Sequence, residues 1–153
     1  VSFTNATTVV ANFTIGTDGT YFIRVENPDG LAVRSSSALL TVSDAPTWST
    51  AAGSLGSIAA GNSVSLSVAA SGDSTIAYSE TTSVLTSNSD TPASTMNLTL
   101  NSSTGAITGT APSPTSETTY NFTLRATDAE AQTADRAFSI TISVGMNNTG
   151  QFN

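Results

Sequence analysis

The chain contains no cysteine, no histidine and no lysine, and its only cationic side chains are four arginines. Without cysteine it forms no disulfide framework, so its composition does not identify a redox compartment. The same absences remove the imidazole base, the thiolate nucleophile and the Schiff-base amine from which most catalytic sites are built. Paired carboxylates would still serve a hydrolase, but the eleven acidic residues are scattered, mostly at turns. The composition therefore predicts that the protein is not an enzyme.

Charge of either sign is scarce, and only 10% of the residues are charged. The net charge of −7 argues against nucleic acid as a partner, because phosphates would be repelled. No apolar run approaches the roughly 18 residues that a membrane span requires. The chain opens on Val1 with no signal peptide, which we interpret as part of a longer product.

Small hydroxyl side chains are abundant, with 27 Thr and 24 Ser among 153 residues. Low charge alone would also be compatible with disorder, but disordered chains are poor in β-branched residues. This chain is rich in Val, Ile and Thr, which fit a pleated strand, and it has no apolar stripe of helical period. The sequence predicts an ordered all-β protein.

The alternation of apolar and polar residues divides the chain near Pro46. A first group of strands is expected at 8–15, 20–26 and 33–43. Within it, Tyr21, Ile23 and Val25 share one face, which makes them candidates for an interface. We expect a partial module over 1–45, a complete domain over 46–144, and a linker or tail over 145–153.

The second group of strands has the spacing of a β-sandwich, with turn signals every 8–12 residues. Its expected strands are 47–51, 63–70, 75–80, 96–100, 105–110, 119–127 and 134–144. Leu66, Val68, Leu124 and Ile140 are predicted to face its core. The least patterned segment, 81–95, is expected to be a long mobile loop.

The segment LTLNSSTGAITGTAPSPTSETTYNFTLRATD, residues 98–128, resembles the putative-immunoglobulin and dystroglycan-type cadherin-like repeats. The resemblance implies tandem Ig-like or cadherin-like β-sandwiches that contact other surfaces and carry no chemistry of their own. Gly19-Thr20-Tyr21 through Asn27-Pro28-Asp29-Gly30 is similar to the closing hairpin of IPT/TIG-type Ig-like domains. That likeness covers about half of such a domain, so residues 1–45 would be completed by upstream sequence or by a neighbouring subunit.

Asp128, Glu130 and Asp135 flank one predicted hairpin turn, and their oxygen-only ligands would suit Ca²⁺. The Asp-x-Asn-Asp calcium sequence of true cadherins is missing, and a solvated acidic turn is the preferred interpretation. We therefore expect no metal and no cofactor. Trp48, beside the predicted linker, would either stack on a sugar or wedge two domains together. The wedge is preferred, which makes Trp48 an interface candidate.

The short, Ser/Thr-rich, lysine-free style of residues 46–56 resembles repeat modules of marine phage structural proteins. The function that this implies is a structural or adhesion segment of a phage virion protein, such as a fibre, whisker or decoration, at the virion surface or outside the cell. Its partners would be other virion or surface subunits, with a homo-oligomer preferred, and a glycan on the host surface. A bacterial surface adhesin or filament module and a carbohydrate-binding accessory module are the alternatives.

Overall fold

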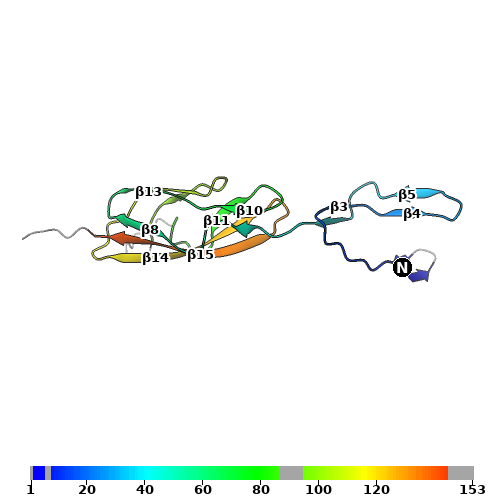
Figure 1. Ribbon diagram of the computed structural model, residues 1–153, viewed down its shortest axis with the longest axis horizontal. Coiled ribbons are helices and arrows are strands. Elements are labelled where there is room, and N and C mark those ends of the chain that lie inside the picture. Colours follow the sequence, from blue (N-terminus) through cyan, green and yellow to red (C-terminus); the bar gives the residue numbers. More distant parts are fainter. Residues whose placement is uncertain (1, 6–7, 87–94, 145–153) are drawn as a thin grey trace, which may run out of the picture. The chain divides into compact units, whose positions relative to one another are not determined.

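The computed structural model describes residues 2–5, 8–86 and 95–144. These residues form strands and turns, which confirms the predicted all-β class (Figure 1). No helix among them is long and apolar enough to cross a membrane. The chain separates into two compact units, residues 1–44 and 45–153. The predicted tail at 145–153 lies outside the described residues.

Unit 2 is a sandwich of two main sheets. The larger sheet has the strand order β11 (Ala77–Glu80), β14 (Thr118–Thr127), β15 (Thr133–Ser143) and β8 (Gly53–Ala59). The smaller sheet has the order β12 (Thr99–Leu100), β13 (Ala106–Thr110) and β9 (Ser63–Ser67). A short pair, β7 (Thr47–Trp48) with β10 (Ala70–Ser71), completes the unit. In Figure 1 β13 and β14 lie on opposite sides of unit 2, as expected for strands of facing sheets.

The core of unit 2 is filled by alternate residues of these strands. Along β14 the buried side chains are Tyr120, Phe122, Leu124 and Ala126. Val64 and Ile107 contribute to the same core from the smaller sheet. The predicted core positions are confirmed at Val68, Leu124 and Ile140, which are buried, while Leu66 is half-buried and packs against the core. Period-two burial from two facing sheets is the pattern of a β-sandwich.

Strand β8 is missing from the predicted strands. It pairs in parallel with β15, from Phe138 opposite Gly53 to Ser143 opposite Ala59, and the register shifts between Ser139 and Thr141. Its sequence Gly-Ser-Leu-Gly-Ser-Ile-Ala has apolar side chains three residues apart instead of two. Glycine lowers strand propensity, and the irregular register breaks the alternation. Only the backbone pairing with β15 makes this segment a strand.

The Ser-Thr-Gly sequence before β13 forms a tight turn. The Asn101 side chain accepts hydrogen bonds from the backbone N–H groups of Ser103 and Thr104, both at 3.0 Å. Gly105 then has φ +70°, and a Cβ placed there would lie 2.3 Å from the carbonyl oxygen of Val68. Only glycine permits both the left-handed backbone and this close approach to Val68, the residue after β9.

Residues 81–86 of the loop expected over 81–95 form a turn that is anchored to the core, while 87–94 lie outside the described residues. Leu85 is fully buried in the core, and its carbonyl accepts the N–H of Leu98 at 2.8 Å. The Glu80 carboxylate accepts backbone N–H bonds from Val84, Leu85 and Thr86 at 2.6, 2.8 and 2.9 Å. The alternation of apolar and polar residues could not predict this role of Glu80, because the backbone groups that it binds lie in a turn without a regular sequence pattern.

The charge of Glu80 should matter to stability. Burial of the carboxylate raises its pKa, but the hydrogen bonds from Leu85, Thr86 and Val84 outweigh burial, so the pKa of Glu80 lies below its ordinary value. A lowered folded-state pKa stabilises the fold above the unfolded pKa, near 4.3, and this contribution disappears as the pH falls through the folded value. Glu80→Gln should therefore lower the free energy of unfolding at pH 7 by about 1–3 kcal/mol, a deficit that narrows in acid.

Urea melts of Glu80→Gln and of the unsubstituted chain between pH 7 and pH 3 measure this effect. Glu117→Gln, an exposed residue in the turn before β14, removes the same charge and serves as the control. A deficit that stays constant over the whole pH range would contradict an ionised Glu80 as the anchor.

The described residues of unit 1 form three antiparallel strand pairs. These are β1 (Ser2–Asn5) with β2 (Thr8–Val10), β3 (Gly19–Tyr21) with β6 (Leu40–Val42), and β4 (Arg24–Glu26) with β5 (Ala32–Arg34). The last two pairs continue one another, because the N–H groups of Ser35 and Leu39 donate to the carbonyls of Ile23 and Tyr21, both at 2.9 Å. The predicted turn at 27–30 closes this hairpin, with Gly30 at φ +85°.

Candidate functional site

Unit 1 leaves much of its apolar surface open. In the described part of the chain, all nine exposed large apolar side chains lie in this unit. They are Val10, Phe13, Phe22, Ile23, Val25, Leu31, Val33, Leu39 and Leu40. Large exposed apolar patches mark interaction sites in soluble proteins.

Two regions of the same hairpin contribute to this surface. Val25 and Val33 stand opposite one another in the β4–β5 pair and are 58% and 71% exposed. Near β3 and β6, apolar side chains line a groove of about 390 Å³. Its lining residues are Phe13, Ile15, Tyr21, Phe22, Ile23, Leu39 and Leu40. A two-stranded ribbon has no second layer to cover its side chains, which is why both the groove and the valine pair remain open.

The structure places the interface candidates of unit 1 on this surface. Ile23 and Val25 are exposed, while Tyr21 is half-buried and lines the groove. The Tyr21 hydroxyl donates to the Thr17 carbonyl at 2.5 Å, a bond back to nearby backbone of the kind made by tyrosine-corner residues. This bond holds the ring in the wall of the groove.

Trp48 is a core residue and not an exposed interface residue, which corrects its assignment from sequence. Its side chain is 6% exposed, and its ring lies 5.3 Å from Phe138 and 5.8 Å from Tyr78 between centroids. The indole N–H donates to the Ala134 carbonyl at 3.0 Å. Sequence showed a tryptophan beside a linker, but the β7–β10 pairing turns it inward.

Asp135 does not lie with the other two acids of its hairpin. It forms a two-pronged ion pair with Arg125 on the neighbouring strand, with N–O distances of 2.7 and 2.8 Å. The hydrogen bond from the Arg125 guanidinium holds the pKa of the Asp135 carboxyl below its ordinary value. Asp135 is thereby committed to a cross-strand pair and leaves the predicted ligand set.

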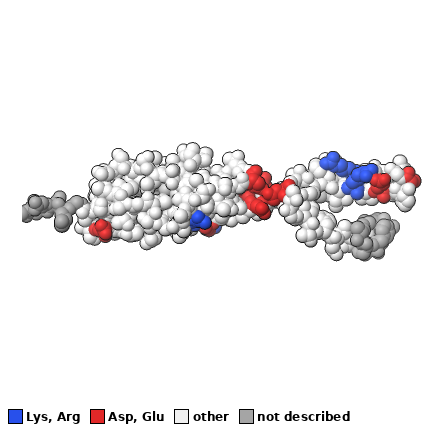
Figure 2. All heavy atoms as spheres, viewed as in Figure 1, with Lys and Arg blue, Asp and Glu red and all other residues white. Residues whose placement is uncertain are grey.

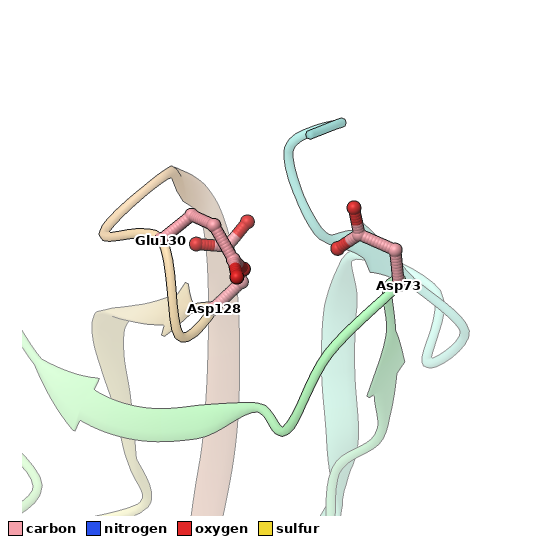
Figure 3. A group of neighbouring side chains, drawn as sticks. All are labelled: Asp73, Asp128 and Glu130. Carbon is pink, nitrogen blue, oxygen red and sulfur yellow. The ribbon is translucent and has the colours of Figure 1, made fainter. Parts of the chain in front are cut away.

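Another acid takes its place. Asp73, in the loop after β10, contributes a carboxylate oxygen to a group with Asp128 and Glu130 in which all ligand atoms lie within 4.8 Å of one another. Figure 3 shows Asp73 pointing across the gap between the two loops toward the other carboxylates. Sequence reasoning missed Asp73 because it is far from the β14–β15 turn in the chain. The only feature of the sequence that could have pointed to Asp73 is its position in the turn Ser-Gly-Asp-Ser, residues 71–74.

No curated protein matches the chain. Among solved structures it is similar to a four-domain fragment of protocadherin gamma B3, with 16% identity, a TM-score of 0.50, and 84% of this chain and 40% of that one covered. The titin Z1Z2 chimera is 13% identical, with a TM-score of 0.45 over 69% of this chain and all of the other. A five-domain fragment of protocadherin gamma B2 has 16% identity and a TM-score of 0.44, with coverage of 82% and 31%. The chain thus spans less than half of these protocadherin fragments, and the likeness concerns the fold.

A family model described as "Putative Ig domain" matches residues 45–143. The match covers almost all of unit 2, including both sheets of the sandwich and the loops that carry Asp73, Asp128 and Glu130. It confirms the resemblance to putative-immunoglobulin repeats that was inferred from residues 98–128. By its sequence, the chain belongs to the putative Ig domain family.

Proposed function

We propose that the chain is a non-enzymatic structural and adhesion segment of a phage virion protein, in which unit 2 is a rigid spacer and unit 1 contacts other subunits. The observation that carries this proposal is the contrast between the units. Unit 2 closes its own core, whereas unit 1 exposes nine large apolar side chains. An Ig-like fold suggests a structural or adhesion module, and the lysine-free, Ser/Thr-rich style of residues 46–56 supports the virion assignment.

The side chains of this protein are better suited to a binding surface than to a catalytic site. The chain has no histidine, cysteine or lysine, so its Ser and Thr hydroxyls lack the imidazole or amine that usually activates them as nucleophiles. The open groove in unit 1 is lined by apolar and aromatic side chains. With Trp48 buried in the core, the carbohydrate-binding alternative loses the aromatic side chain on which it was based.

Immunogold electron microscopy tests the virion assignment. Antibodies raised against residues 1–153 should label the surface of virus particles purified from the source material. Label confined to bacterial cell envelopes would overturn the proposal in favour of a surface adhesin or filament.

Association through unit 1 is a separate expectation. The double substitution Val25→Ser and Val33→Ser removes a facing apolar pair without touching unit 2. It should weaken self-association of the chain at least tenfold, a loss that corresponds to about 1.4 kcal/mol, when measured by analytical ultracentrifugation. Ala77→Ser, at an exposed position of β11, is the control. Equal association of the double variant and the unsubstituted chain would show that this surface is not the contact.

A further inference from the structure

Two loops of unit 2 bring three carboxylates to one point. Asp73 lies in the loop between β10 and β11, and Asp128 and Glu130 lie in the turn between β14 and β15. One oxygen from each lies within 4.8 Å of the other two (Figure 3). We propose that this group is a Ca²⁺-binding site formed by Asp73, Asp128 and Glu130.

The buried state of Asp128 is an independent indication of a bound cation. Its side chain is only 6% exposed. One carboxylate oxygen, Oδ1, accepts the Gln132 N–H at 2.7 Å, but the other, Oδ2, is buried without a hydrogen-bond partner. Buried charges in proteins are paired or coordinate metals, because an unpaired carboxylate loses its hydration without replacement. A cation at the meeting point of the three carboxylates would supply the missing partner.

The arginines of unit 2 do not neutralise the group. Arg125 is paired with Asp135, and the Arg136 guanidinium donates to the carbonyls of Trp48 and Thr50 at 3.4 and 2.7 Å. With no lysine in the chain, no other cationic side chain of this unit is available. On the face drawn in Figure 2, the acidic side chains at this end of unit 2 have no basic side chain beside them. Three like charges at such separations repel one another. A divalent cation bound between them would attract all three carboxylates and so offset this repulsion.

Contacts between the two loops hold the carboxylates in place. The Ser74 hydroxyl donates to Glu130 Oε2 at 2.8 Å and accepts the Ala129 N–H at 3.0 Å. Within the turn, the Asp128 N–H donates to the Gln132 carbonyl at 3.1 Å. The loop of Asp73 is thus tied to the loop of Asp128 and Glu130 through its neighbour Ser74. A site whose ligands are already positioned loses less conformational freedom when the ion binds.

The chemistry of the group favours calcium among the common cations. All its ligands are carboxylate oxygens, which suit hard cations and not zinc. Calcium binds oxygen at about 2.3–2.6 Å, so two ligands of one ion stand at most about 5 Å apart, and the 4.8 Å span of the group meets this limit. Magnesium requires shorter bonds in a near-ideal octahedron. Because Asp73 and Glu130 are exposed, water can complete the coordination.

The proposal differs from the solvated acidic turn expected from the sequence. That expectation considered Asp128, Glu130 and Asp135, of which Asp135 is committed to Arg125. Asp73 supplies the third carboxylate from the neighbouring loop. The site lies wholly within unit 2, so the inference does not depend on the assembly role proposed for unit 1.

Calorimetric titration of chelator-treated chain 1–153 with CaCl₂ tests the site. We expect saturable binding at one ion per chain, and a rise of several degrees in the melting midpoint of unit 2 in millimolar Ca²⁺, because a ligand that binds only the folded state stabilises it. Asp73→Asn should weaken Ca²⁺ binding at least tenfold. Glu130→Gln should do the same, and since both side chains are exposed, neither substitution should prevent folding.

Glu117→Gln is the matched control, since it removes one exposed negative charge away from the group and should leave Ca²⁺ binding unchanged. Amide shifts in nuclear magnetic resonance spectra should change with Ca²⁺ at residues 73–74 and 128–132. The proposal is overturned if no saturable binding and no midpoint shift occur, or if Glu117→Gln weakens binding as much as Asp73→Asn. Equal stabilisation by Mg²⁺ at the same concentration would overturn the assignment to calcium.

Discussion

Leu124→Ala should lower the free energy of unfolding of unit 2 by about 2–5 kcal/mol. Leu124 lies in β14, the second strand of the larger sheet, opposite Glu80 on β11 and Arg136 on β15. Its side chain is fully buried. Truncation removes apolar contacts and leaves a cavity that neighbouring strands, fixed on both sides by backbone hydrogen bonds, cannot close.

Urea melts followed by tryptophan fluorescence measure this loss directly. Trp48 is the only tryptophan of the chain, and it packs against Phe138 in the same core, so its emission reports on unit 2. Leu31→Ala in unit 1 is the matched control, because Leu31 is 69% exposed and its truncation should cost less than about 0.5 kcal/mol. A loss of that small size at Leu124 would mean that the core is assembled differently.

Hydrogen exchange should separate the two units by a large factor. In a monomeric sample, the hydrogen-bonded amides of β3 to β6 should exchange about a thousandfold faster than those of β14 and β15. This factor corresponds to a difference of about 4 kcal/mol in the free energy of opening. The reason is that few contacts cover the hairpin of unit 1. Ile23, Val25 and Val33 remain 49%, 58% and 71% exposed, whereas β14 and β15 are buried or half-buried along one face.

Mass spectrometry of peptides from residues 19–42 and 118–143 provides the measurement, with sample concentration as the control. Protection of unit 1 should rise with concentration if other copies cover its apolar side chains. Equal protection of both units in a dilute, strictly monomeric sample would show that unit 1 closes its own core, and that it needs no other chain for stability.

Local signals in the sequence were sufficient for the class of fold and for most strands of unit 2. Strands β9, β14 and β15 were anticipated because each carries period-two alternation, and this pattern needs no knowledge of the strand's partner. The turn ending at Gly105 was visible for a similar reason, since its residues determine its backbone. The prediction of a protein without the usual catalytic side chains rests on composition, which does not depend on folding.

Only the tertiary structure decided which residues meet. Strand β8 has little alternation and exists through its backbone pairing with β15. Trp48 is directed into the core by packing against Phe138. Asp73 joins Asp128 and Glu130 because two loops at one end of the sandwich are brought together, while Asp135 is drawn away by Arg125 in the facing register. The physical reason is that alternation specifies which face of a strand is apolar, but the packing of the two sheets specifies which loops become neighbours.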